Sequence, residues 1–411
     1  MTAATERSLK RDITTFVTLT GLLAFMAVAT DLYLPAIPAM TQELGGSISD
    51  GQLTLSIFML GVAGGQLIFG PLSDHYGRLP VVRAGAVGFI VFSLISAFAW
   101  SIEYVWTARL FHGAVAASGP VIARAMIRDR YEGDRAAQIM ALTSASMALL
   151  PLIAPTLGAI ILVEFGWRAT FLVLALYAIA CLLGLSTFQE TAPAKLRGET
   201  ARQLTFGDVF GSFGACLKHP RFIGYQLAGT LSFCGLFVYL STVSFFLTDV
   251  FNVPTKYFGL AFAVSVTGFL VGSLTSSRLV LSLGQDKTMI VGTVVCVLST
   301  GIALLVTSRF ESAHLLLAGL STGFFFGVGL VSANASMGAV SLFADKAGAA
   351  SAVYGSVHSL SSALIGAIAG MTYSGRMLEP ITLMFLCATG SLLGSYIVSK
   401  TTPNGTHRPK K

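Results

Sequence analysis

Long apolar runs are the feature that most constrains this chain. Twelve of them follow one another, each near or above 20 residues, and most are joined by short polar turns. An α-helix needs about 20 apolar residues to cross the hydrocarbon core of a bilayer, whereas the strands of a β-barrel are shorter and alternate in polarity. The sequence therefore predicts an all-α membrane protein with twelve transmembrane helices, near 14–38, 51–73, 81–100, 104–124, 136–162, 167–188, 222–248, 257–281, 288–308, 313–337, 347–373 and 380–399.

The composition agrees with a membrane protein. Only 11% of the 411 residues are charged, and 54% are hydrophobic. Soluble proteins carry about 25% charged residues, so this chain lacks the side chains that would cover a water-exposed surface. A soluble enzyme, a nucleic-acid-binding protein and a disordered chain are therefore excluded. The five cysteines show no disulfide or metal-ligand spacing, so we expect buried reduced thiols, no metal and no cofactor.

One long polar connection, from about Glu190 to Arg221, divides the spans into six plus six. A short repeat, Asp134-Arg135-Ala136 and Asp345-Lys346-Ala347, recurs at an offset of 211 where the fifth and eleventh spans begin. Repeated halves with a site between them are typical of transporters. We therefore predict two six-helix halves around a central cavity, with an N-terminal half (1–189), a cytoplasmic loop (190–220) and a C-terminal half (221–411).

The distribution of Lys and Arg predicts the orientation. Twenty-one of these residues fall in the termini and the even-numbered loops, four fall in the opposite loops, and Arg109 lies inside a span. Positive charge favours the cytoplasmic side, so both ends of the chain are expected in the cytoplasm. This bias also accounts for the net charge of +7 without a nucleic-acid partner. The apolar run that follows Arg11 is too long for a signal peptide, so the first span is expected to be retained.

Two charged side chains, Asp31 and Arg109, lie well within the predicted spans. A charge at membrane depth costs at least about 3 kcal/mol, so such residues usually face a cavity or a partner. Counting residues along the first and fourth spans places both in the outer half of the bilayer. We expect them to face one cavity and to interact, directly or through water, with Asp31 as the proton carrier. The alternative is a structural ion pair that only fixes helix packing.

Weaker candidates surround this pair. His112 lies one turn below Arg109 on the same helix face, where it would relay protons, line the cavity or simply pack. Polar and aromatic side chains in other spans would either line the cavity or pack between helices. For the aromatic residues, packing is the default. The candidates for lining the cavity are Tyr33, His112, Phe233, Phe237, Tyr239, Asn334 and His358.

The loop between the second and third spans reads Gly70-Pro71-Leu72-Ser73-Asp74-His75-Tyr76-Gly77-Arg78. Glycines suit a tight turn, and Asp74 and Arg78 suit the N- and C-terminal ends of neighbouring helices. We expect this loop to act as a latch on the cytoplasmic face. The residues assigned to the latch are Gly70, Asp74, Gly77, Arg78, Arg128 and Asp129.

These motifs resemble those of the major facilitator superfamily. The latch is similar to the family's G-x-L-x-D-x-x-G-R loop, although Leu79 replaces a basic residue, and Arg109-Leu110-Phe111-His112-Gly113 resembles its R-x-x-Q-G signature. The segment around Pro155 and Gly158 looks like the antiporter motif, with alanine at two glycine positions. Asp31-Leu32-Tyr33-Leu34-Pro35-Ala36-Ile37-Pro38 and Arg128-Asp129-Arg130-Tyr131 resemble segments of the Bcr/CflA (bicyclomycin/chloramphenicol resistance) subgroup of drug:proton antiporters.

The resemblance implies a monomeric exporter in a bacterial inner membrane, surrounded by lipid, that exchanges incoming protons for outgoing drugs of a multidrug or chloramphenicol/florfenicol type. It also implies that Asp31 and Arg109 carry coupling and substrate binding. A proton-coupled metabolite symporter of the same fold is the main alternative. A membrane enzyme is disfavoured because the sequence shows no catalytic constellation, and a receptor or channel because of the six-plus-six division.

Overall fold

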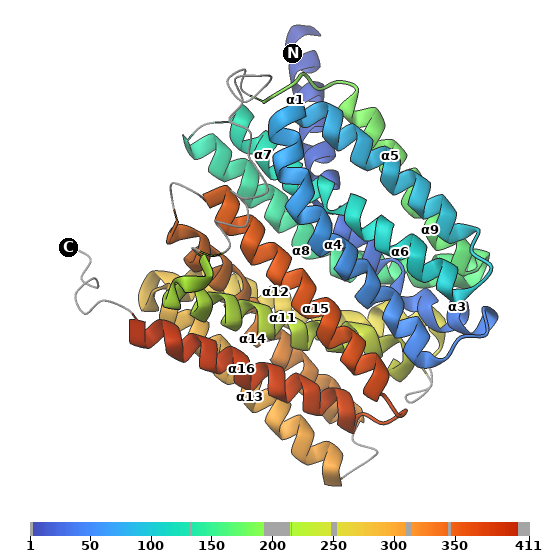
Figure 1. The fold of residues 1–411 in the computed structure, drawn as a ribbon, viewed down its shortest axis with the longest axis vertical. Coiled ribbons are helices and arrows are strands. Elements are labelled where there is room, and N and C mark those ends of the chain that lie inside the picture. The colour runs from blue at the N-terminus through green and yellow to red at the C-terminus, as the bar shows by residue number, and fades with distance from the viewer. Residues whose placement is uncertain are drawn as a thin grey trace. The chain divides into compact units, whose positions relative to one another are not determined.

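The computed structural model describes residues 3–131, 133–192, 214, 216–247, 253–309, 314–343 and 347–401. Within these ranges every regular element is a helix (Figure 1). The first part of the chain forms α1 (Ala3–Leu23), α2 (Phe25–Asp31), η1 (Leu34–Ala36), α3 (Ile37–Glu43), α4 (Ile48–Tyr76), α5 (Arg78–Ala97), α6 (Ile102–Ala116), α7 (Ser118–Arg130), α8 (Gly133–Phe165) and α9 (Trp167–Leu185). The second part forms α11 (Pro220–Phe245), η4 (Thr255–Tyr257), α12 (Phe258–Leu283), α13 (Gln285–Arg309), α14 (His314–Ser341), α15 (Ala347–Thr372) and α16 (Leu378–Thr401).

These helices account for the twelve predicted spans. Ten described helices are long and apolar enough to cross a membrane, and α6 and α7 together form one of them, Ile102–Arg130. The bent pair Ile13–Leu23 and Phe25–Glu43 supplies an eleventh. The fifth predicted span lies in α8, whose described apolar part is Leu149–Phe165. The predicted all-α membrane fold is therefore confirmed.

The first span differs from the single helix expected over 14–38. It bends by 58° at Ala24 and continues to Glu43. The Tyr177 hydroxyl donates to the Gly21 carbonyl at 2.5 Å, in the last turn before the break, and a side chain that enters the helical ladder is a common cause of a kink. Beyond the break, Leu34–Ala36 form a short 3-10 turn. It contains Pro35, which lacks the N–H that a helix interior needs.

The contacts within the chain divide it into two compact units. The boundaries between these units fall inside α11, α12 and α15. The first unit contains Met1–Thr205, Val238–Val266 and Gly355–Arg376, and the second contains Phe206–Phe237, Thr267–Tyr354 and Met377–Lys411. In the first unit α4 packs on α6 and α5 on α9, whereas in the second α13 packs on α14 and α16. The division into halves at residues 189 and 221 stays a prediction. Asp345 and Lys346, and the side chains of 134–136, lie outside the described residues.

The contact between α4 and α6 is unusually close. A Cβ atom added at Gly61 would overlap the Leu110 carbonyl, and one added at Gly113 would overlap the Phe58 carbonyl. Small residues let two helix backbones approach in this way. The close approach brings the Phe58 side chain of α4 beside Arg109 of α6, so this packing shapes the candidate site.

Candidate functional site

Arg109 lies at the centre of the candidate site and is fully buried. One terminal nitrogen donates to the Ala29 carbonyl of α2 at 3.2 Å, and the other lies 3.2 Å from Nδ1 of His112. Aromatic rings face the guanidinium and stabilise it through cation–π attraction. Their centroids lie 4.1 Å (Phe58), 4.8 Å (Tyr33) and 6.0 Å (Phe171) from its central carbon.

Asp31 ends α2 and is also buried, with 6% of its surface exposed. Its Oδ1 accepts a hydrogen bond from the Thr30 hydroxyl at 3.1 Å. Among the contacts of the described residues, no ion pair joins Asp31 to Arg109. Arg109 instead binds the carbonyl of Ala29, which lies two residues before Asp31. The structure thus places both side chains inside the first unit without a direct contact, which was one of the two kinds of interaction that the sequence predicted.

Tyr33 is packed rather than open to a cavity. It is fully buried, and its hydroxyl lies 2.9 Å from the Thr54 hydroxyl and 3.3 Å from the sulfur of Met40. The Thr54 hydroxyl donates to the Gly51 carbonyl at 2.6 Å, so Tyr33 is the donor to Thr54. These contacts hold the Tyr33 ring next to Arg109.

The remaining candidates are distributed between the two units. In the second unit Asn334 of α14 donates to the Ser276 hydroxyl of α12 at 2.8 Å, which favours the role of a helix-joining residue, and Phe237 is buried. Phe233 of α11 belongs to the same unit. In the first unit the Tyr239 hydroxyl lies 2.8 Å from that of Ser265, and His358 lies in α15.

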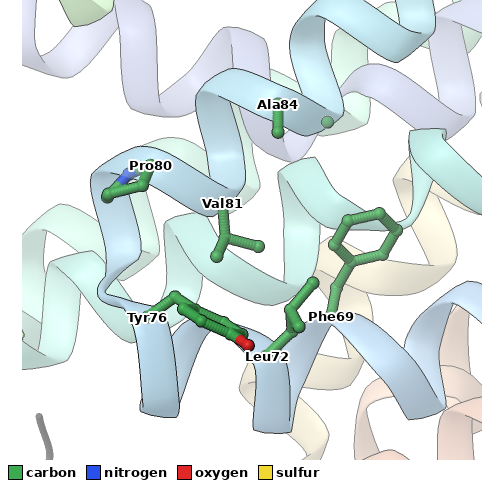
Figure 2. A pocket seen from close by; sticks show the side chains of 7 residues that line it. Phe69, Leu72, Tyr76, Pro80, Val81 and Ala84 are labelled. Atoms are coloured by element: carbon green, nitrogen blue, oxygen red, sulfur yellow. The ribbon is translucent and has the colours of Figure 1, made fainter. Parts of the chain in front are cut away.

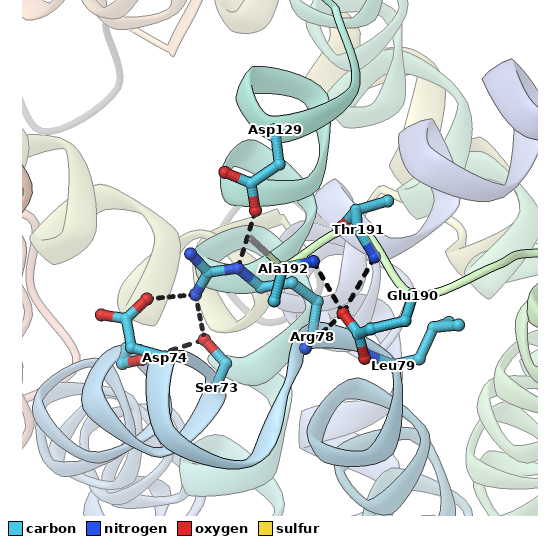
Figure 3. A network of polar contacts seen from close by, with 9 residues as sticks. Ser73, Asp74, Arg78, Leu79, Asp129, Glu190, Thr191 and Ala192 are labelled. Carbon is cyan, nitrogen blue, oxygen red and sulfur yellow. Dashed lines mark hydrogen bonds and ion pairs between the residues drawn. The ribbon is translucent and has the colours of Figure 1, made fainter. Parts of the chain in front are cut away.

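Arg78 holds together the turn between α4 and α5 (Figure 3). Its guanidinium pairs with Asp74, donates to Asp129 of α7 at 2.9 Å and donates to the Ser73 hydroxyl at 2.8 Å. The Arg78 side chain is only 4% exposed, so the pair with Asp129 is shielded from water. Gly77 makes the turn at a φ of +98°, a conformation that favours glycine.

Of the predicted latch residues, Gly70 joins this cluster only through its backbone carbonyl, which accepts from the Ser73 hydroxyl at 2.9 Å, and Arg128 lies outside it. Gly70 lies inside α4, which continues to Tyr76, so the prediction that it shapes the turn is wrong. The helix continues past Gly70 because Pro71 alone does not stop it, and Gly77 is the residue whose backbone reverses the chain. Arg128 is exposed and does not contribute to the bonds of Arg78.

Glu190 binds the turn between α4 and α5, a role that the sequence did not predict. Its carboxylate accepts backbone N–H groups from Arg78 (3.0 Å) and Leu79 (3.1 Å), and from Thr191 (2.9 Å) and Ala192 (2.8 Å) (Figure 3). It thereby caps the start of α5, which lies more than a hundred residues earlier in the chain. Burial by itself raises the pKa of Glu190, but these four N–H groups together hold it below its ordinary value of 4.5.

Gly158 of the antiporter-motif helix, α8, lies against the residue that follows Asp31. A Cβ atom at position 158 would overlap the Leu32 carbonyl and lie 3.0 Å from Pro35. Pro155 lies inside the same helix. Of the two alanines that replace glycine in the motif, Ala154 is 4% exposed and Ala159 is fully buried. The packing of α8 on the bent first span therefore depends on Gly158.

Two hollows lie away from Asp31 and Arg109. One of about 390 Å³, between α4 and α5 next to the Gly77 turn, is lined by apolar parts of Phe69, Leu72, Tyr76, Pro80, Val81, Ala84 and Gly85 (Figure 2). The other, of about 270 Å³, lies in the second unit beside Arg221, Tyr225, Gln285, Asp286, Ser341 and Leu342.

Comparison with known proteins places the chain in a family. The family model described as "Major Facilitator Superfamily" matches residues 17–367. The "Bicyclomycin resistance protein homolog" of Haemophilus influenzae is 26% identical, covering 93% of this chain and 96% of that protein. The "Multidrug resistance protein MdtL" of Klebsiella pneumoniae (27% identical; 90% and 91% covered) and the "Chloramphenicol resistance protein" of Pseudomonas aeruginosa (27%; 91% and 88%) are also similar.

The fold has a solved counterpart. The crystal structure of a bacterial homologue of the human lysosomal transporter Spinster superposes with a TM-score of 0.71 at 15% identity, over 96% of this chain and 99% of that one. That likeness shows the fold alone. Because the family model covers most of the sequence, this chain belongs to the Major Facilitator Superfamily, as its motifs predicted, and is a membrane transporter and not an enzyme.

Proposed function

We propose that this transporter exports drugs or antibiotics from the bacterial cytoplasm in exchange for protons, in the inner membrane and with both termini in the cytoplasm. The names of its relatives support export of antimicrobial compounds, including chloramphenicol-type molecules. The observation that carries the proton coupling is a buried acid, Asp31, on the same short helix as the carbonyl that holds the buried Arg109.

The chemistry of this pair suits a proton-driven switch. Deprotonated Asp31 carries a negative charge that attracts the guanidinium of Arg109, whereas protonated Asp31 does not. The observed arrangement, with Arg109 held by Ala29 and His112 and not by Asp31, is the one expected when Asp31 is protonated. Loss of the proton would draw Arg109 toward Asp31 and move α2 relative to α6.

Alternating access would couple this local change to export. A drug would enter an apolar, partly aromatic cavity from the cytoplasm or the inner leaflet. Protonation of Asp31 from outside would then favour the return to the inward-facing state, so that drug and proton compete. Because the site holds one acid and one base, neutral and zwitterionic drugs are the substrates that fit best.

Proteoliposomes that contain the purified transporter and a pH-sensitive dye test the proposal. Adding chloramphenicol should drive proton movement in the wild-type protein, and Asp31→Asn should abolish that movement while still binding the drug. Glu164→Gln is the matched control, because it makes the same chemical change at an exposed acid of α8. Proton-coupled drug transport by Asp31→Asn at the wild-type rate would contradict the proposal, and metabolite uptake along the gradient would favour a symporter.

A further inference from the structure

His112 connects Arg109 to the next helix through a chain of hydrogen bonds. Its Nδ1 lies 3.2 Å from a terminal nitrogen of Arg109, and its Nε2 lies 3.1 Å from the hydroxyl of Ser93 in α5. The ring is fully buried between the side chains of Phe58 and Phe89, whose centroids lie 5.8 and 4.3 Å from its own. Both ring nitrogens therefore have one defined partner each.

The partners determine where the proton of His112 lies. A guanidinium has only N–H donors, so Nδ1 of His112 accepts a hydrogen bond with its lone pair. A neutral imidazole carries one proton, which must then lie on Nε2 and point at the Ser93 hydroxyl. A doubly protonated ring would turn an N–H toward the N–H of Arg109 and place two positive charges side by side.

Within the described residues, no acid contacts the His112 ring to compensate a second charge. Helix α4 presents Phe58 to the ring, α5 presents Phe89 and Ser93, and α6 presents Arg109. Among the described residues that contact His112, Arg109 is the one charged group. The arrangement stabilises a neutral ring with a fixed tautomer.

We propose that His112 is a positioning residue that holds Arg109 for the coupling step as a neutral Nε2–H tautomer, and that it does not carry the transported proton. The coupling role rests on the proposed function, whereas the tautomer does not. The proposal also accounts for the departure from the family signature, which usually has glutamine here. A glutamine amide is neutral, and it too offers one acceptor to Arg109 and one donor to Ser93.

Transport by three variants tests the positioning role. His112→Gln should keep drug-driven proton transport within about twofold of wild type, with an unchanged pH profile, because it preserves both hydrogen bonds. His112→Leu removes the acceptor from a buried cation, and its maximal rate should fall by about tenfold or more. Ser93→Ala removes only the partner of Nε2 and should have a smaller effect. A His112→Gln variant with a shifted acid limb would overturn the proposal and make His112 a proton carrier.

Nitrogen NMR of the full-length transporter gives a readout that does not depend on transport. Histidine labelled with ¹⁵N reports directly which ring nitrogen is protonated, and the chain has six histidines. The signal that disappears in His112→Gln should be that of a neutral Nε2–H ring, and Ser93→Ala should keep that tautomer, because Arg109 still requires a lone pair on Nδ1. A neutral Nδ1–H ring or a doubly protonated ring at neutral pH would overturn the proposal, even if the protein exports no drug.

Discussion

The turns that follow α4 and α12 are each made by a glycine, but the residues after the glycines form different bonds. Each is made by a glycine at positive φ, Gly77 at +98° and Gly284 at +79°. After Gly77 comes Arg78, whose guanidinium contacts two carboxylates. After Gly284 comes Gln285, whose amide donates to the Asn334 carbonyl of α14 at 2.5 Å. The residue after the glycine therefore contacts its neighbours through a charged guanidinium in the first turn, after α4, and through a neutral amide in the second turn, after α12.

The second turn has an ion pair as well, but in a different position. Asp286 accepts from Arg221 of α11 at 2.8 Å and from the Tyr225 hydroxyl at 2.5 Å. The side chains of Arg221 and Asp286 are 20% and 15% exposed, against 4% for Arg78 and 9% for Asp129. Water screens a more exposed pair, so its removal costs less. The difference teaches that the first turn depends on one buried arginine, whereas the second divides its bonds among several residues.

Arg78→Ala is expected to have the largest effect on this comparison. It leaves the Asp129 carboxylate buried without its cation, which costs about 3–5 kcal/mol of folding stability. The corresponding change in the second turn, Gln285→Ala, removes one neutral hydrogen bond and should cost about 1 kcal/mol. Thermal unfolding of the purified proteins in detergent measures both.

Arg128→Ala serves as the control for this experiment. It removes an arginine from the same helix end as Asp129, but Arg128 is exposed and lies outside the Arg78 cluster. Its unfolding temperature should stay near that of wild type. Equal losses in Arg78→Ala and Gln285→Ala would show that the two turns are equivalent, against the comparison.

Substituting the two glycines should separate backbone strain from crowding. Alanine at a positive φ costs roughly 1–2 kcal/mol at either turn. At Gly77 the new Cβ atom would also lie 2.6 Å from the Glu190 carboxylate, so that the cap of α5 must shift. Gly77→Ala should therefore lower the unfolding temperature more than Gly284→Ala. A larger loss in Gly284→Ala would mean that the second turn is the more constrained one.

The sequence was sufficient to predict the membrane helices and the side chains that meet at the turn after α4. Twelve apolar runs of bilayer length leave few alternatives to membrane helices, because backbone polar groups in lipid must bond within their own segment. Asp74 and Arg78 were assigned to the latch at the ends of neighbouring helices, and the structure shows in addition that they pair with each other. Asp129 was assigned to the same latch, and the structure places it on Arg78.

The sequence was not sufficient for Glu190 or for the bend of the first span. Glu190 binds backbone N–H groups of Arg78 and Leu79, and a backbone donor leaves no trace in the pattern of side chains. The bend at Ala24 coincides with a bond from Tyr177, which is distant in sequence. Both features depend on how α9 and the segment after it pack, which no local pattern encodes.

The expected contact between Asp31 and Arg109 shows a different limit. Counting residues along two helices gives the depth of each side chain in the membrane, but not its direction around the helix axis. Arg109 bonds to the Ala29 carbonyl of the same helix that carries Asp31, and the interaction of the two side chains through a shared cavity stays a prediction. The role of His112 could not be chosen from the sequence for the same reason. Its tautomer depends on the partners of its two ring nitrogens, and the sequence does not show which side chains these are.

Glu190→Gln is expected to have the smallest effect. It tests how much the bonds of Glu190 to the backbone of the first turn add to those of the Arg78 side chain. An amide has one acceptor oxygen where the carboxylate has two, so part of the cap of α5 is lost, at a cost of about 1 kcal/mol. The pKa of Glu190 lies below its ordinary value of 4.5 in the folded protein. The unfolded chain then takes up the proton first as the pH falls.

The sign of the pH effect follows from that order. The stabilisation by Glu190 is fully present above pH 4.5 and is lost as the pH falls through the lower pKa of the folded state. Unfolding temperatures measured from pH 7 down to the acid limit of the detergent sample should therefore converge for wild type and Glu190→Gln. Curves that stay parallel would mean that the carboxylate charge contributes nothing to the cap. The first turn would then be held by Arg78 alone, which would make it more dependent on a single residue than the second.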